Sequence, residues 1–281
     1  MNFSLERFDL DAFVASTLAE DLGDHGDITS QAVIPADAIF TASMRSREAV
    51  TVAGLLLAEA MFRALDPDVE IEMLVRDGDH APEATELMRV TGNARALLAA
   101  ERSALNIVQH LTGIATITRR YVDAIAGTGA ILLDTRKTIP GLRVLEKYAT
   151  RMGGATNHRM RLDDAAMIKD NHVAVAGGIA EAVRRAVAAR IERIIVEVDR
   201  LDQIEPAIAA GATNLLLDNM DAAMLSEAVA MVGGRIPTEA SGGVTLETIV
   251  AKAASGVTYI SVGRITQSAP AADIGLDYAT F

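Results

Sequence analysis

The sequence predicts an α/β protein in two parts, an N-terminal part with an antiparallel sheet and a C-terminal part with a parallel sheet. Before about residue 126, the short candidate strands alternate apolar and polar residues, which is typical of a sheet with one covered face. After Gly129, continuous apolar runs alternate with amphipathic stretches, which is typical of parallel strands buried on both faces. The 281 residues are enough for one large α/β barrel domain or for two ordinary domains.

The N-terminal part contains helical and strand patterns in alternation. Apolar residues at helical spacing predict a first helix, and the polar segment EDLGDHGDITS that follows it predicts a loop. A long helical pattern closes this part, with Gly113 as a candidate break between two helices. The predicted elements are helices at 9–20, 54–65 and 93–126, strands at 39–45 and 69–75, and the loop at 20–30.

Six apolar runs define the C-terminal part. Between them lie amphipathic helical segments such as 177–190 and 246–255. The alternation predicts either a barrel or a doubly wound sheet. The six runs are ILLDT (131–135), AAMIK (165–169), RIIVEVD (193–199), NLLLD (214–218), IPTEAS (236–241) and TYISVG (258–263).

Composition excludes several classes of protein. The chain has no Cys, so it has no disulfide framework, no Cys-ligated metal and no thiol nucleophile. Its net charge of −12 and its lack of Trp argue against a nucleic-acid binder. No apolar run is long enough to span a membrane, and the first residues do not have the pattern of a signal peptide. We therefore expect a cytoplasmic protein.

Polar residues or glycines stand at the end of every predicted parallel strand. Ligands of parallel α/β folds bind at the carboxyl ends of the strands, so these residues are candidates for one site. The alternative is that charged residues end strands simply where the chain reaches solvent. The strand-end residues are Arg136 and Lys137, Lys169, Glu197 and Asp199, Asp218, Glu239 with Ser241 to Gly243, and Gly263 with Arg264.

Residues 136–169 form a basic segment in an acidic chain, with eight Lys or Arg residues against three acids. The spacing of Arg143, Lys147 and Arg151 predicts one solvent-exposed helix face. Four of the remaining five, together with His158, lie at predicted strand or loop ends and favour a basic pocket for a small, strongly anionic ligand. These are Arg136, Lys137, His158, Arg159 and Lys169.

Two acids on consecutive strands, Glu197 and Asp218, supply the opposite charge. Carboxylates that face phosphate groups commonly hold Mg²⁺, although salt bridges to the lysines are the alternative. The glycine-containing turns at 241–243 and 262–264 are typical of phosphate-binding loops, in which backbone N–H groups approach the anion closely. None of the common nucleotide-binding, zinc-protease or serine-hydrolase motifs is present.

Taken together, these segments resemble quinolinate phosphoribosyltransferases over essentially the whole chain and in the same order. The motifs are EDLGDHGDITS (20–30), ERSALN (101–106), TGIAT (112–116), TRKTIPGLRVLEKYA (135–149), GGATNHR (153–159), MIKDNH (167–172), VEVD (196–199), LLLDNM (215–220), EASGG (239–243) and ISVGRI (260–265).

The resemblance implies an N-terminal α/β sandwich domain at 1–112 and an incomplete, TIM-like α/β barrel at 113–265. The tail at 266–281 is then expected to pack on the N-terminal domain. It also implies a homodimer that uses Mg²⁺ to join quinolinate and phosphoribosyl pyrophosphate into nicotinate mononucleotide, with release of CO₂ and pyrophosphate, in de novo NAD biosynthesis.

The resemblance also assigns roles to residues. Arg136, Arg159 and Lys169, with His158 nearby, match positions that hold the quinolinate carboxylates, together with Arg102 from the partner subunit. Lys137 matches the lysine at the pyrophosphate, and Thr135 lies beside it. Glu197 and Asp218 match the acids that hold the ribose hydroxyls and Mg²⁺. The catalytic set is therefore Lys137, Lys169, Glu197 and Asp218, and the 5′-phosphate loops are Ser241, Gly242 and Gly243 with Val262, Gly263 and Arg264.

The chain departs from the family pattern at 80–90, where an expected glycine is replaced, and Arg264 is a second local difference. Two alternative functions share the fold. A paralogue associated with molybdenum transport would lack the intact KDNH motif that this chain carries at 169–172, in which His172 is expected to order the loop after Lys169. A non-catalytic barrel scaffold would show gaps in the charged set, and the sequence shows none.

Overall fold

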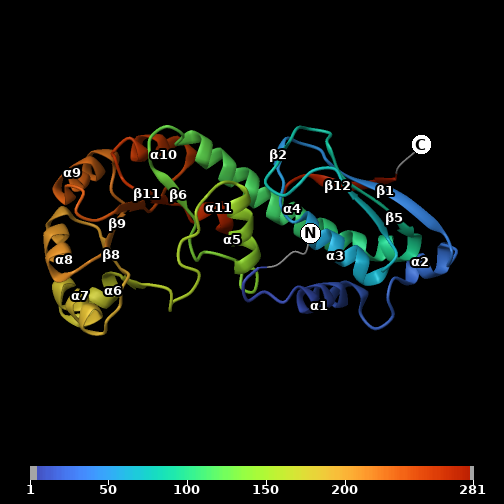
Figure 1. The fold of residues 1–281 in the computed structure, drawn as a ribbon, viewed down its shortest axis with the longest axis horizontal. Coiled ribbons are helices and arrows are strands. Elements are labelled where there is room, and N and C mark those ends of the chain that lie inside the picture. Colours follow the sequence, from blue (N-terminus) through green and yellow to red (C-terminus); the bar gives the residue numbers. More distant parts are fainter. Residues whose placement is uncertain (1–4, 279–281) are drawn as a thin grey trace. The chain divides into compact units, whose positions relative to one another are not determined.

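The computed structural model describes residues 5–278, which form two compact units. The first unit contains residues up to Ile117, Val144–Gly154 and the segment from Ser268 onward, and the second contains Thr118–Arg143 and Ala155–Gln267. Figure 1 shows an antiparallel sheet with helices in the first unit and a parallel sheet with helices in the second. The predicted fold class, an α/β chain with an N-terminal sheet domain and a C-terminal parallel sheet, is confirmed.

The first unit is built on a four-stranded antiparallel sheet in the order β12-β1-β5-β3. The last strand of the chain, β12, pairs with β1, with Ser46 opposite Ile274. Its elements are α1 (Leu10–Leu22), α2 (Ile28–Val33), β1 (Ile39–Ser46), β2 (Val50–Thr51), α3 (Leu55–Leu65), β3 (Glu70–Met73), β4 (His80–Ala81), β5 (Glu86–Asn93), α4 (Ala94–Ala124, which continues into the second unit), α5 (Arg143–Met152) and β12 (Ile274–Tyr278).

The second unit is built on a six-stranded parallel sheet in the order β6-β11-β10-β9-β8-β7. The helices that connect the strands lie on its outer side (Figure 1). Its elements are β6 (Ile131–Leu133), β7 (Ala166–Ile168), α6 (Asp170–Ala176), α7 (Ile179–Ala188), β8 (Ile194–Val198), the 3-10 turn Leu201–Gln203, α8 (Ile204–Ala210), β9 (Asn214–Asp218), α9 (Ala222–Val232), β10 (Thr238–Ser241), α10 (Leu246–Ala253), β11 (Tyr259–Ser261) and α11 (Arg264–Gln267).

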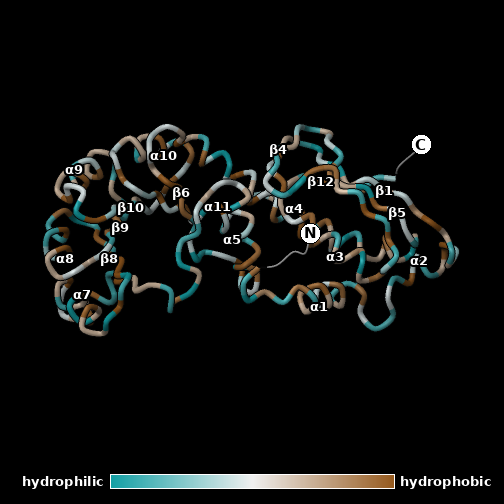
Figure 2. Tube along the Cα trace, in the orientation of Figure 1, coloured by the Kyte–Doolittle hydropathy of each residue, from teal (hydrophilic) through white to brown (hydrophobic). Residues whose placement is uncertain are grey.

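Burial follows the hydrophobic pattern of the sequence. Strands β8 and β9 are almost entirely buried, because helices cover their outer face and inward-facing residues fill the other. The helices alternate hydrophobic and hydrophilic positions along the trace, as Figure 2 shows for α1 and α3. At about 25 cal/mol per Å², burial of such strands supplies the main stabilising term of the fold.

Three local predictions were wrong. The segment 20–30 is not one loop, because α1 runs to Leu22 and Asp27 caps a second helix, α2, by accepting hydrogen bonds from the backbone N–H groups of Thr29 and Ser30. Helix α4 continues through Gly113, where the lack of a side chain lets the carbonyl group of Pro270 approach the helix closely.

The predicted solvent-exposed face of the helix at 143–151 was the third error. Lys147 and the neighbouring Glu146 are fully buried, and only Arg151 is exposed. His110 Nε2 lies 2.9 Å from Glu146 Oε1, so packing of α4 against α5 encloses charged groups that the spacing alone assigned to solvent. Charged groups are tolerated in such places when they are paired.

Candidate active site

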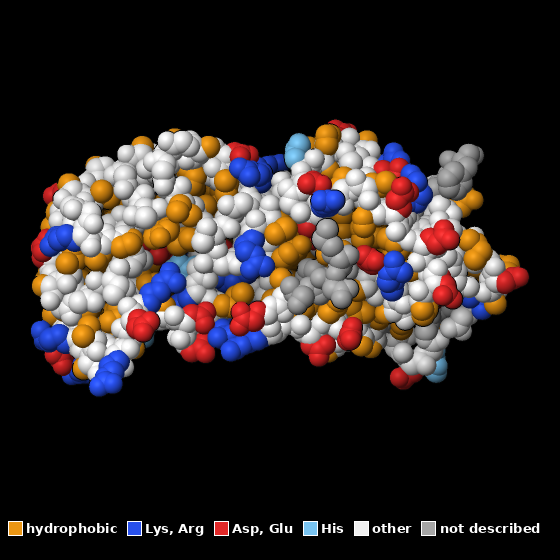
Figure 3. All heavy atoms as spheres, in the orientation of Figure 1, with side chains coloured by type: hydrophobic (Ala, Val, Ile, Leu, Met, Phe, Trp, Pro, Cys, Tyr) orange, Lys and Arg blue, Asp and Glu red, His pale blue; other side chains and the backbone are white. Residues whose placement is uncertain are grey.

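A cavity of about 620 Å³ opens at the carboxyl ends of the parallel strands, within the second unit. Figure 3 shows Lys and Arg side chains beside a His side chain in a hollow of this unit, on the left of the view. The structure brings together here every predicted site residue except Arg102: Thr135, Arg136, Lys137, His158, Arg159, Lys169, Glu197, Asp218, Ser241, Gly242, Gly243, Val262, Gly263 and Arg264.

The basic wall of the cavity comes from the chain after β6 and from the segment before β7. Burial lowers the pKa of the Arg159 guanidinium, and the positive charge of nearby Arg136 lowers it further. The Nη1 group of Arg159 donates a hydrogen bond of 2.8 Å to the Ala165 carbonyl. The Nε group of Arg136 is buried and has no hydrogen-bond partner within the described chain. A guanidinium with an unused donor, close to a second guanidinium, is a strong site for a bidentate anion.

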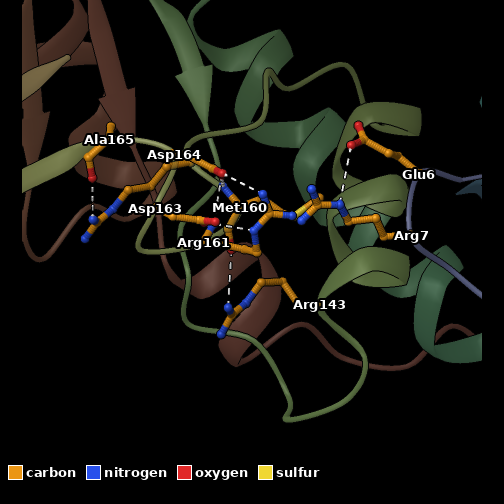
Figure 4. A network of polar contacts seen from close by, with 9 residues as sticks. Glu6, Arg7, Arg143, Met160, Arg161, Asp163, Asp164 and Ala165 are labelled. Atoms are coloured by element: carbon orange, nitrogen blue, oxygen red, sulfur yellow. Dashed lines mark hydrogen bonds and ion pairs between the residues drawn. The ribbon is translucent and has the colours of Figure 1, made fainter. Parts of the chain in front are cut away.

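The loop that follows Arg159 has a different arrangement. Arg161 points to Asp163 and Asp164, and Arg143 donates a hydrogen bond to the Met160 carbonyl, as Figure 4 shows. These contacts pair arginines of the basic segment with neighbouring acceptors. The cavity is therefore lined by only a subset of the basic residues, and a count of charges along the chain does not identify which ones.

The two predicted carboxylates both line the cavity. Lys169 Nζ lies 2.6 Å from Glu197 Oε2, and Asp218 Oδ2 accepts a hydrogen bond of 2.7 Å from the Asn219 side chain. The salt bridge to Lys169 is the arrangement that the sequence left open as the alternative to a metal role. Each carboxylate retains a second oxygen, and Mg²⁺ is commonly held by one or two carboxylates with water and substrate phosphates. The donor set therefore fits Mg²⁺, although no group of three acidic or His side chains in the described chain forms a cage of its own.

The KDNH motif shapes the chain directly after β7. The backbone N–H of Lys169 donates a hydrogen bond of 3.0 Å to His172 Nδ1, which caps the start of α6. This contact holds Lys169 at the strand end, where its side chain is 45% exposed toward the cavity. The prediction that His172 orders this loop agrees with the contact.

Two glycines allow the strand-end loops to pack closely. Gly242 has φ of +85°, and a Cβ there would collide with the side chain of Asn219, whose own backbone N–H donates to the Ser241 carbonyl at 3.0 Å. A Cβ on Gly263 would lie 2.7 Å from Cδ of Lys137. A Cβ at either position would therefore displace a neighbouring group, the Asn219 side chain at Gly242 or the Lys137 side chain at Gly263.

Sequence reasoning missed the floor of the cavity. Glu239 on β10 is 1% exposed and lines the cavity, and its Oε2 lies 3.3 Å from His158 Nε2 and 3.3 Å from Asn214 Nδ2. Glu239 was included among the strand-end residues from the sequence but was given no role in the site. The signal that could have found it is its position two residues before Ser241, which places both side chains on the same face of the strand.

Arg102 lies apart from this set. It is exposed on α4 and does not line the cavity. The single chain therefore does not place it in the site, and its predicted role depends on a second subunit.

The geometry defines a class of site before any relative is considered: an anion-binding cavity at the carboxyl ends of parallel α/β strands, with acids placed to hold a cation or hydroxyl groups. Comparison with known proteins gives a consistent result. Two family models match the chain, the N-terminal domain of quinolinate phosphoribosyl transferase at residues 27–112 and its C-terminal domain at 114–277.

Individual relatives cover nearly the whole chain. A nicotinate-nucleotide pyrophosphorylase (carboxylating) of Mycobacterium leprae is 43% identical over 94% of this chain and 95% of its own, and a chloroplastic protein of that name from Arabidopsis thaliana is 41% identical over 97% and 84%. The solved nicotinate-nucleotide pyrophosphorylase of Francisella tularensis superposes with a TM-score of 0.92 at 38% identity, covering 99% of this chain and all of the other. The chain belongs to the quinolinate phosphoribosyl transferase family.

Proposed function

We propose that this enzyme transfers the phosphoribosyl group of phosphoribosyl pyrophosphate to quinolinate and releases CO₂ and pyrophosphate, which yields nicotinate mononucleotide for de novo NAD biosynthesis. The observation that carries the proposal is the cavity in which Arg136, Arg159 and Lys169 face two acids and two glycine loops. Family membership selects this reaction among those that such a cavity could support. The intact KDNH motif and the complete charged set argue against the paralogue of molybdenum transport and against a scaffold.

The reaction needs no protein nucleophile. The ring nitrogen of quinolinate forms the new bond to C1 of the ribose as the C1–oxygen bond to pyrophosphate breaks. The bond from C2 to its carboxylate then breaks with loss of CO₂, the positive charge of the pyridinium nitrogen stabilises the electron pair left on C2, and that pair takes up a proton. Catalysis therefore consists of orientation and charge stabilisation, which fits a site without Cys.

Each group of residues has a part in this proposal. Arg136, Arg159 and Lys169 bind the quinolinate carboxylates beside His158, and Lys137 with Thr135 stabilises the leaving pyrophosphate. The loops Ser241 to Gly243 and Val262 to Arg264 hold the 5′-phosphate. Glu197 and Asp218 hold the ribose hydroxyl groups and Mg²⁺, and when bound the ion supplies positive charge to the pyrophosphate.

Assembly and location complete the proposal. A homodimer would bring Arg102 of one subunit to the cavity of the other, where its guanidinium would add to the carboxylate-binding wall. No helix among the described residues combines the length and the apolar character that a membrane span requires. We propose that the protein acts in the cytoplasm, although relatives are named for chloroplasts and mitochondria.

The test is formation of nicotinate mononucleotide by the purified protein, followed by chromatography, with quinolinate, phosphoribosyl pyrophosphate and Mg²⁺. Release of CO₂ from quinolinate labelled at the 2-carboxylate should match product formation one to one. Absence of product, with the protein folded and dimeric, would refute the proposal.

A further inference from the structure

The buried acid on the cavity floor has a function that its packing does not explain. Glu239 Oε1 is buried without a hydrogen-bond partner within the described chain, and so is Asn214 Oδ1 beside it. A half-satisfied buried carboxylate destabilises a fold, and purely structural polar networks are normally satisfied. The presence of Glu239 is therefore better explained by the contact that its second oxygen, Oε2, makes with the ring of His158.

The hydrogen bonds of His158 define the position of its ring proton. The backbone nitrogen of Arg159 lies 2.7 Å from His158 Nδ1. A backbone N–H can only donate, so Nδ1 is the acceptor and carries no proton. The proton of the neutral ring is then on Nε2, from which it is donated to Glu239 Oε2. The ring thus connects the floor carboxylate to the backbone of Arg159.

The same segment is held from a second side. The backbone N–H of His158 donates a hydrogen bond of 2.8 Å to Asp134 Oδ1, and Asp134 is fully buried. Two consecutive backbone N–H groups are therefore fixed, one by Asp134 and one by the His158 ring. The second of these groups belongs to Arg159, whose guanidinium lines the cavity.

We propose that Glu239 is a positioning residue: it fixes the His158 ring in the Nε2-protonated form, and the ring in turn holds the backbone of Arg159 in the carboxylate-binding wall. The inference rests on the proposed function for the identity of the ligand that Arg159 binds. Glu239 does not itself contact the anionic substrate, because its own negative charge would repel the quinolinate carboxylates.

The first measurement needs no substrate. The imidazole ¹⁵N chemical shifts of the intact protein distinguish the two neutral tautomers and the protonated ring. The chain has five histidines, and the His158 signals are those missing from a His158→Gln variant. We expect wild-type His158 to be neutral and protonated at Nε2 alone. A ring protonated at Nδ1, or a doubly protonated ring, at about pH 7.5 would overturn the proposal.

The second measurement separates positioning from mere stability. Glu239→Ala should raise the KM for quinolinate at least about tenfold and change the KM for phosphoribosyl pyrophosphate less than about twofold, because a displaced Arg159 faces only the first substrate. In Glu239→Gln the amide oxygen still accepts from Nε2, so this variant should keep the tautomer and most of the quinolinate affinity. Equal changes in both KM values would refute the proposal.

Asn214→Ala is the matched control. It removes the other hydrogen bond of Glu239 and leaves the contact with His158 in place. We expect the tautomer and both KM values to remain near those of the wild type, and a defect equal to that of Glu239→Ala would show that the network serves stability alone. If Glu239→Ala does not fold, the tautomer of the wild-type ring and the KM values of Glu239→Gln still test the proposal. If the protein has the expected tautomer but no activity, the proposed function is refuted, whereas the role of Glu239 in fixing the His158 ring remains supported.

Discussion

The two sheets of this protein use charged residues in opposite ways. In the antiparallel sheet, Arg89 pairs with Glu72 and with Glu86 at 2.8 Å each, on partly exposed side chains. In the parallel sheet, charged groups stand at the strand ends around a cavity, and two of them, Arg136 Nε and Glu239 Oε1, are buried without a hydrogen-bond partner in the described chain.

The exposed charged groups of the antiparallel sheet satisfy one another, whereas two buried charged groups of the parallel sheet each leave one polar atom without a partner among the described residues. Exposed pairs such as those of Arg89 each contribute at most about 1 kcal/mol to stability. Buried polar atoms without partners lower stability, and they persist where function requires them. Changes at the parallel sheet should therefore act on activity, whereas changes at the antiparallel sheet should act on stability alone.

The largest effect should follow removal of divalent metal. Excess EDTA should reduce product formation to background, and Mg²⁺ or Mn²⁺ should restore it. Glu197→Gln and Asp218→Asn should each raise the Mg²⁺ concentration needed for half-maximal rate, because one carboxylate ligand is lost. Full activity of the wild type in EDTA would exclude a metal role for these acids.

Substrate choice tests whether the basic wall is built for two carboxylates. Nicotinate lacks the 2-carboxylate, so the groups that pair with it would remain desolvated and unpaired. We expect kcat/KM for nicotinate to be at least about 10³-fold below that for quinolinate. Equal turnover in a direct comparison by chromatography would point to another phosphoribosyltransferase.

Removal of single cations should have the next largest effect. Lys137→Ala and Lys169→Ala should each lower kcat/KM at least about 10²-fold through loss of preorganised charge. Thermal unfolding should shift little, since neither side chain is buried. Arg161→Ala is the control: it comes from the same basic segment but pairs with Asp163 and Asp164, and its activity should match the wild type. Near wild-type activity of both lysine variants would disprove the pocket assignment.

Mixed dimers test whether Arg102 acts across subunits. Arg102→Ala and Lys169→Ala should each be nearly inactive alone. In a mixed dimer, one site has both intact residues and the other has neither, so random exchange should restore roughly a quarter of wild-type activity. Exchange is checked by native mass spectrometry. If mixed dimers form and show no activity, Arg102 acts in the site of its own subunit or has no role in the reaction.

The smallest effect concerns the departure from the family pattern at 80–90. Ala84 has φ of +64°, a left-handed conformation that costs a residue with a Cβ about 1–2 kcal/mol. Ala84→Gly should therefore raise the free energy of unfolding by about 1 kcal/mol or slightly less, measured in urea, with unchanged activity. Ala36→Gly, at an exposed position that is not among the positive-φ residues, should lower it by a few tenths of a kcal/mol. A loss of stability in Ala84→Gly would show that the turn is not strained.

The sequence by itself determined the order of the elements and the strand-end residues. Apolar runs separated by amphipathic helices require a parallel sheet, and the chain must then deliver residues such as Lys137, Lys169 and Asp218 to one edge. These features depend on residues close together in the chain, so periodicity and turn chemistry are sufficient to predict them.

The tertiary structure decided which charged groups are paired, buried or left without a partner. The spacing of Lys147 predicts an exposed residue, but its side chain is fully buried. Gly113 was a candidate helix break, but it lies inside a continuous helix, against Pro270. Glu239 meets His158 across 81 positions of the sequence. Such contacts depend on how distant elements pack, and local patterns carry no information about the partner that a side chain meets.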